Sequence, residues 1–134
     1  MIGDWVNYRG TNIKITSLYD KGESNEIGWG LMESTWVNGI NVEPIPLTAE
    51  ILEKNGFTDG EYRHYVGCIW KLNVEGFRIL NLTESCGKSC LWGEKIKPNY
   101  PNSVGNKFTI PNICYVHELQ HAMRICGIEK EIII

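Results

Sequence analysis

The longest helix-periodic run in this chain is Tyr115-Val116-His117-Glu118-Leu119-Gln120-His121-Ala122-Met123-Arg124-Ile125-Cys126-Gly127. With about 100° between successive residues, one arc of the helix is apolar and contains Tyr115, Val116, Leu119, Ala122, Met123 and Cys126. The opposite arc is polar and contains His117, Gln120, His121 and Arg124. Gly127 has no Cβ, so it can adopt the left-handed conformation that ends a helix. The run therefore predicts an amphipathic helix whose apolar stripe packs on a core and whose two histidines face solvent.

The same run contains the word His117-Glu118-Leu119-Gln120-His121, which fits the H-E-x-x-H pattern of zinc peptidases. In that pattern two histidines one turn apart bind the metal and the glutamate acts as general base. Such a site needs a third protein ligand, and Arg124 stands where the metzincin pattern has glycine. An upstream ligand such as His64 or a cysteine is the open alternative.

A second zinc hypothesis combines Cys86 and Cys90 with His117 and His121 as a Cys2His2 ligand set. The sequence separation between the two pairs is longer than the usual finger spacing of about 12–15 residues. The simpler interpretation has two loop thiols and two surface histidines, with no metal bound. The other three cysteines are predicted to be small core residues, as buried cysteines commonly are: Cys68, Cys114 and Cys126.

Composition places the chain among ordinary globular proteins. It has 134 residues, of which 43% are hydrophobic and 22% are charged, so we expect a single domain, 1–134. We find no signal peptide and no apolar run of membrane-spanning length. Together with an odd number of cysteines, five, this predicts reduced thiols and a cytoplasmic protein. The net charge of −3, with scattered lysines, makes nucleic acid an unlikely partner.

Two β lobes are predicted on either side of a short helix. In lobe 1–46, Ile13 and Ile15 alternate with polar residues, and Asn38-Gly39 predicts a type I′ hairpin between its flanking strands. We expect this lobe to form a curled, SH3-like sheet. Residues 47–56 then form the joining helix, with Thr48 as its cap and Gly56 at its end.

The second lobe, 57–134, begins with another alternating pattern. Residues 66–72 and 77–82 predict a hairpin of two strands. Residues 83–106 are rich in Gly, Ser, Lys, Pro and Asn, so we expect a loop holding one short strand at 90–92. Residues 129–134 are apolar enough to form an edge strand or a packed extension.

Three words together give a family resemblance. They are the opening Ile2-Gly3-Asp4-Trp5-Val6-Asn7-Tyr8, the central Glu43-Pro44-Ile45-Pro46-Leu47-Thr48 that runs on through Ile51-Leu52-Glu53-Lys54-Asn55-Gly56-Phe57, and the closing Tyr115-Val116-His117-Glu118-Leu119-Gln120. With these words the chain resembles a family of small uncharacterised proteins from phages and integrated elements of anaerobic gut bacteria. The resemblance implies no reaction. In the closing word of that family, Gln and Asn can stand where Glu118 and His121 stand here.

The sequence thus predicts an α+β domain of mostly antiparallel strands, with a short central helix and a C-terminal amphipathic helix. We expect a non-enzymatic accessory protein of a phage or mobile element that binds a host protein or a small ligand. No catalytic, cofactor-binding or metal-binding residue is assigned. The alternative is a zinc protein that uses His117 and His121, either with Glu118 as base or with Cys86 and Cys90 as further ligands.

Overall fold

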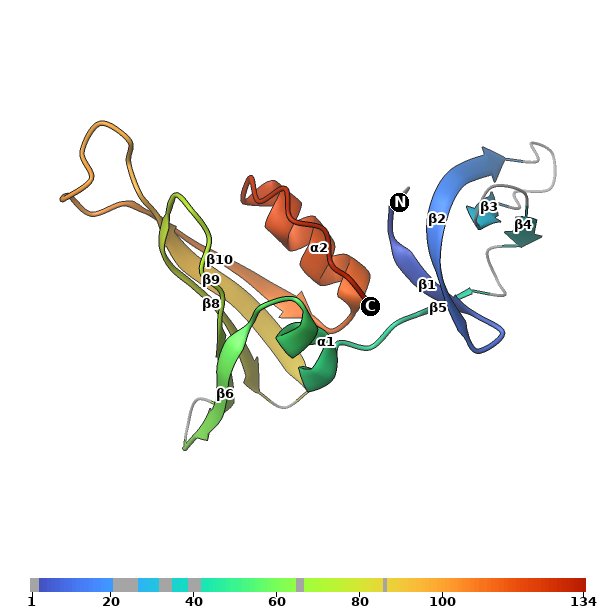
Figure 1. The fold of residues 1–134 in the computed structure, drawn as a ribbon, viewed down its shortest axis with the longest axis horizontal. Helices are drawn as coiled ribbons and strands as arrows, with labels where there is room; N and C mark the ends of the chain where they lie inside the picture. The colour runs from blue at the N-terminus through green and yellow to red at the C-terminus, as the bar shows by residue number, and fades with distance from the viewer. Residues whose placement is uncertain (1–2, 21–26, 32–34, 39–41, 65–66, 86) are drawn as a thin grey trace.

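A computed structural model describes residues 3–20, 27–31, 35–38, 42–64, 67–85 and 87–134. It confirms the α+β class, with two antiparallel five-stranded sheets and two helices in the described chain. Figure 1 shows α2 lying between the second sheet and the first strands of the chain. The polypeptide crosses from one sheet to the other through the short helix α1.

The first sheet has the strand order β4-β3-β2-β1-β5. Its strands are β1 (Trp5–Tyr8), β2 (Thr11–Asp20), β3 (Ile27–Leu31), β4 (Thr35–Asn38) and β5 (Val42–Pro44). Val6 and Ile15 form a small core of their own, against which three partly buried side chains pack: Tyr8, Ile13 and Val42. The likeness to an SH3 domain stays a prediction.

The predicted Asn38-Gly39 hairpin falls largely on residues 39–41, which lie outside the described residues, and it stays a prediction. The flanking strands, however, take different partners, since β4 pairs with β3 and β5 pairs with β1 at the opposite edge of the sheet. Pairing with β1 fixes the place of β5 in the sheet.

Helix α1 (Ala49–Lys54) falls inside the predicted range 47–56. The hydroxyl of Thr48 accepts the N–H of Ile51 at 3.3 Å, which is the capping bond expected from the sequence. Leu52 is buried on the face turned to the core. Asn55 follows at the C-cap and is also buried, which is unusual for an amide side chain.

The second sheet has the order β10-β9-β8-β7-β6. Its strands are β6 (Thr58–Arg63), β7 (Gly67–Lys71), β8 (Phe77–Ser85), β9 (Lys88–Lys95) and β10 (Asn106–Ile113). The predicted hairpin is confirmed as β7 and β8, which pair in antiparallel register with Trp70 opposite Leu82. This sheet carries the larger core.

The expected extent of the loop over 83–106 is wrong, because β8 continues to Ser85 and the single strand in this range, β9, covers Lys88–Lys95. Only residues 96–105 connect β9 to β10 without regular structure. The polar composition of this range suggested a loop. In β9, however, buried and less buried residues alternate, and Ser89, Leu91 and Gly93 are buried against the neighbouring strands. Gly93 allows close packing, since a Cβ there would lie 2.2 Å from the carbonyl oxygen of Ile79.

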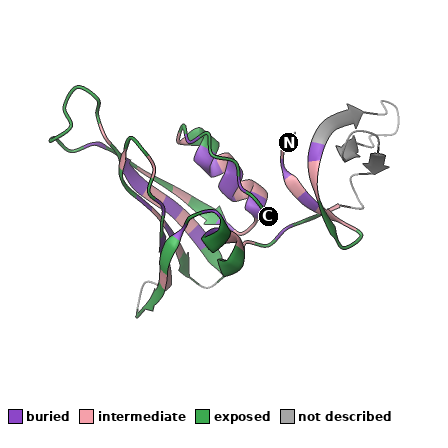
Figure 2. Ribbon diagram, viewed as in Figure 1, coloured by how far each residue is buried: buried purple, intermediate pink, exposed green. Residues whose placement is uncertain are grey.

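Helix α2 (Val116–Ile125) confirms the amphipathic helix and covers the second sheet, as the buried stripe in Figure 2 shows. Val116, Leu119 and Met123 are almost fully buried. Residues 129–134 form no strand, but Ile128 and Ile132 are buried in the same core. The described chain contains no helix with the length and apolar character needed to cross a bilayer.

Candidate functional site

The H-E-x-x-H glutamate lies at the start of α2, where it satisfies the backbone. One carboxylate oxygen of Glu118 accepts the N–H of Cys114 at 2.7 Å and the N–H of Tyr115 at 3.1 Å. A glutamate at the third position of a helix commonly binds back in this way, because the first N–H groups lack helical partners. One oxygen of the carboxylate therefore already accepts two backbone N–H groups. The general base of a zinc peptidase would instead face a metal-bound water.

The two histidines of the motif are not on an open surface, which corrects the expectation that they face solvent. Nε2 of His121 lies 2.8 Å from Oδ1 of Asp4, a buried carboxylate just before β1. The ring of His117 stacks on Tyr115 at 5.8 Å between centroids and meets the edge of His121 at 5.8 Å. The three rings are neighbours along α2, and packing of the first lobe against α2 brings Asp4 to His121.

Burial lowers the pKa of His117, because removal from water disfavours the charged imidazolium. The negative charges of Asp4 and Glu118 oppose this effect but do not cancel it. His117 is thus held toward the neutral form. Its ring packs against the rings of Tyr115 and His121.

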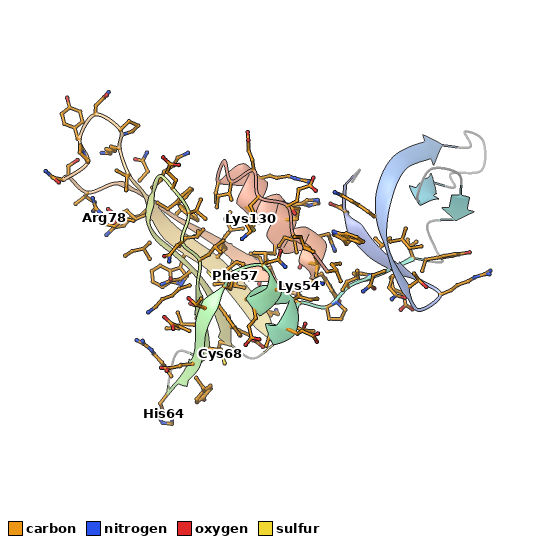
Figure 3. All side chains as sticks on the ribbon, viewed as in Figure 1. Lys54, Phe57, His64, Cys68, Arg78 and Lys130 are labelled. Atoms are coloured by element: carbon orange, nitrogen blue, oxygen red, sulfur yellow. The ribbon has the colours of Figure 1, made fainter. Side chains whose placement is uncertain are left out.

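The zinc hypotheses find little further support in the described residues. No group of three or more His, Cys, Asp or Glu side chains there is placed to hold one metal ion. His64 lies at the far tip beyond β6, well away from α2 in Figure 3. Cys90 is half-buried on β9 and Cys86 lies outside the described residues. The described cysteines are free thiols: Cys68, Cys90, Cys114 and Cys126.

A second feature of α2 is the buried carboxamide of Gln120, which binds the backbone of residues 128–134. Its Oε1 accepts the N–H of Ile132 at 2.7 Å, and its Nε2 donates to the carbonyl of Lys130 at 3.1 Å. The indole N–H of Trp5 donates to the carbonyl of Ile132 at 2.9 Å. The sequence predicted that Gln120 faces solvent, and this prediction is wrong. Gln120 is buried between α2 and residues 128–134, where its carboxamide binds their backbone.

Asn55 repeats the arrangement one residue further along. Its Oδ1 accepts the N–H of Ile133 and its Nδ2 donates to the carbonyl of the same residue, both at 2.7 Å. Nζ of Lys130 in turn donates to the carbonyl of Asn55. Residues 128–134 are therefore held by side chains from the C-cap of α1, from α2 and from β1.

The connection between β9 and β10 is mostly exposed to solvent. This β9–β10 loop, residues 96–105, projects as the orange loop at the far end of the molecule in Figure 1. Tyr100 and Val104 are 68% and 65% exposed on it. Large apolar side chains exposed together on a projecting loop are typical of an interaction surface.

Hydrogen bonds fix the shape of this loop at its base, where Figure 3 labels Arg78. Nη2 of Arg78 donates to the carbonyls of Pro101 at 2.9 Å and Ser103 at 3.0 Å. Nη1 of Arg78 lies 2.8 Å from Oε1 of Glu94, and the same oxygen accepts the N–H of Gly105 at 2.7 Å. A buried carboxylate and one guanidinium therefore hold the C-terminal half of the loop, residues 101–105, against β8 and β9.

Further bonds hold the loop tip. The N–H of Tyr100 donates to the carbonyl of Lys97 at 3.1 Å. The carbonyl of Tyr100 accepts the N–H of Ser103 at 3.1 Å and its hydroxyl at 2.8 Å. Beside the loop base lies a shallow hollow of about 280 Å³, whose lining includes Arg78, Ile79, Asn81 and Trp92.

Sequence reasoning missed both arrangements, and only the β9–β10 loop had a visible signal. Pro98 and Pro101 flank Tyr100, and proline fixes φ, so an ordered loop was a reasonable alternative to a mobile one. Gln120 carried no such signal, because its partners are backbone groups in residues 130 and 132. Comparison with known protein families, curated proteins and solved structures finds no match to this chain.

Proposed function

We propose that this chain is a non-enzymatic binding protein that engages a host protein through its β9–β10 loop. The observation that carries the proposal is an ordered loop with Tyr100 and Val104 at its exposed surface. Tyrosine is among the residues that most often dominate binding energy at protein interfaces. Its large amphipathic ring supplies contact area at a small entropic cost.

Preorganisation is the physical reason to prefer this loop over other exposed surfaces. A loop that is disordered when free must lose conformational entropy on binding, and this loss reduces affinity. Here Arg78 and Glu94 fix the loop base before any partner arrives. Exposed tyrosine alone does not distinguish the loop, because Tyr62 on β6 is 73% exposed. Tyr62 therefore offers a matched control.

A protein partner is favoured over a small ligand by the shallowness of the hollow beside the loop. Small-molecule sites usually enclose about 300–1,000 Å³ and bury most of the ligand. The hollow near Arg78 and Trp92 is about 280 Å³, close to the lower end of that range, but it is shallow and would leave much of a small ligand exposed. The assignment to a phage or mobile element rests on the sequence resemblance, and a cytoplasmic location rests on the odd cysteine count.

The proposal is tested by capture from lysates of anaerobic gut bacteria with wild-type, Tyr100→Ala and Tyr62→Ala proteins. We expect one host protein to be enriched by the wild type and by Tyr62→Ala but not by Tyr100→Ala. Equal capture by all three would contradict the role of the loop. Turnover of a peptide or nucleotide substrate that disappears in His117→Ala would instead establish an enzyme.

A further inference from the structure

Residues 128–134 are bound as an extended peptide is bound by a receptor. In the described chain they pair with no strand, and side chains make most of their polar contacts. Two buried carboxamides, from Asn55 and Gln120, each donate to a backbone carbonyl and accept a backbone N–H. Ile128 and Ile132 fill the apolar positions. Any copy of this segment that reached the groove would satisfy the same contacts.

We propose that segment 128–134 exchanges between two copies of the chain, each copy filling the groove of the other. The groove consists of Trp5, Asn55, Gln120 and the core around them. Exchange of an identical element is a low-cost route to a dimer, because all contacts within the groove are kept. The free-energy difference between monomer and exchanged dimer is then decided mainly at the hinge.

The hinge is Gly127, which follows α2 directly. Its φ of +80° turns the chain back, and the N–H of Ile128 donates to the carbonyl of Met123 at 2.9 Å to close the turn. A residue with a Cβ is strained at this φ. A Cβ there would otherwise meet only the flexible end of Lys95, at 3.4 Å. Substitution by alanine therefore opposes the closed turn and favours continuation of the helix.

An exposed aliphatic side chain just before the hinge supplies a second observation. Ile125 is 78% exposed. Isolated exposed aliphatic residues are common, but Ile125 lies at the point where the chain would cross to the second copy. An exchanged dimer brings the two hinges together, so that the Ile125 side chains of the two copies can cover each other.

The test compares Gly127→Ala with Gly76→Ala by sedimentation velocity over a range of concentrations. Gly76 has φ +86° and no atom within 4 Å of an added Cβ, so it carries the same backbone strain in a remote turn. Relief of hinge strain by about 1.4 kcal/mol is tenfold for each chain. We expect the dimer dissociation constant to fall by about a hundredfold in Gly127→Ala and to be unchanged in Gly76→Ala.

Crosslinking then shows whether the dimer exchanges this segment. Nζ of Lys14 lies 2.6 Å from the carboxylate of Glu131, so a carbodiimide joins them as an amide with loss of water. In a mixture of ¹⁵N-labelled and unlabelled chains, the dimer fraction should contain Lys14–Glu131 peptides of mixed isotope. Dimers with only same-isotope links would overturn the proposal. So would failure of Gly127→Ala to dimerise more than Gly76→Ala.

The wild-type protein provides the same test if Gly127→Ala does not fold. Concentrated, isotopically mixed wild type is crosslinked after equilibration, and its dimer fraction is isolated. Mixed Lys14–Glu131 links support exchange. Absence of a dimer, or a dimer with same-isotope links alone, contradicts it.

Discussion

The side chain of Gln120 binds the peptide backbone at Ile132, with its Oε1 accepting the N–H at 2.7 Å in a buried environment. Helical periodicity places Gln120 on the polar arc of α2, yet the residue is almost fully enclosed. The enclosure arises because residues 128–134 fold back over that side of the helix. The part of the polar arc that carries Gln120 is thus an internal interface, whereas Arg124 on the same arc stays exposed.

Replacement of Gln120 by alanine should reduce the free energy of unfolding by about 1–3 kcal/mol. The substitution leaves the buried N–H of Ile132 without this acceptor, and an unsatisfied buried donor carries that cost. The exposed amide Asn73 gives a control, since Asn73→Ala should change stability by no more than about 0.5 kcal/mol. Urea melts of the two variants provide the measurement. Equal urea midpoints for Gln120→Ala and Asn73→Ala would show that the Gln120 contacts contribute nothing to the free energy of unfolding.

Leu119→Ala should destabilise the protein by about 2–5 kcal/mol, the range for a buried leucine. Leu119 is fully enclosed at the centre of the stripe that α2 buries against the second sheet. Chemical denaturation measures the change directly. A loss below about 1 kcal/mol would mean that the core at α2 rearranges to fill the space.

His121→Asn tests the contact between α2 and the first lobe. Treating His121 as a surface residue predicts a change within about 0.5 kcal/mol. Its bond to the buried carboxylate of Asp4 at 2.8 Å instead predicts a loss of about 1–2 kcal/mol. A double-mutant cycle with Asp4→Asn isolates the coupling between the two side chains. Strict additivity of the two substitutions would argue that the contact contributes no energy.

The pH dependence of stability should carry a contribution from His117. Burial lowers its pKa in the folded protein below the ordinary value of 6.5, so the unfolded chain binds the proton more readily. The free energy of unfolding should therefore fall as pH falls through 6.5, and recover above it. Urea melts across this range, compared with His117→Gln, give the measurement. A steeper loss in His117→Gln than in wild type would contradict this sign.

Arg78→Ala should loosen the β9–β10 loop while leaving the second sheet intact. Arg78 holds the carbonyls of Pro101 and Ser103, and its removal frees the loop from the strand beside it. Amide hydrogen exchange at Gly105 and Ser103 should become faster, with little change in the amides of β7. Unchanged exchange at Gly105 would show that Glu94 alone fixes the loop base.

Local pattern was sufficient for much of this fold. The spacing of apolar residues predicted α2, the hydroxyl and glycine signals predicted α1, and alternation predicted the β7–β8 hairpin. These elements are encoded by near neighbours in sequence. The class of the fold follows from them.

Contacts between distant residues account for what the sequence did not reveal. Asp4 and His121 are 117 residues apart, and Asn55 and Ile133 are 78 apart. No periodicity links such pairs, so their burial could not be inferred from one sequence. Polar strand residues in β9 likewise resembled a loop, because their exposed neighbours and Gly93 concealed the alternation.

The measurement that tests the central claim most directly is the affinity of the captured host protein for three forms of the chain. Isothermal titration should show that Tyr100→Ala loses about 2 kcal/mol or more of binding free energy, which is about thirtyfold in dissociation constant. Tyr62→Ala, with an equally exposed ring on β6, should bind within about twofold of wild type. Equal affinities for all three proteins, or a larger loss in Tyr62→Ala, would contradict recognition through the β9–β10 loop.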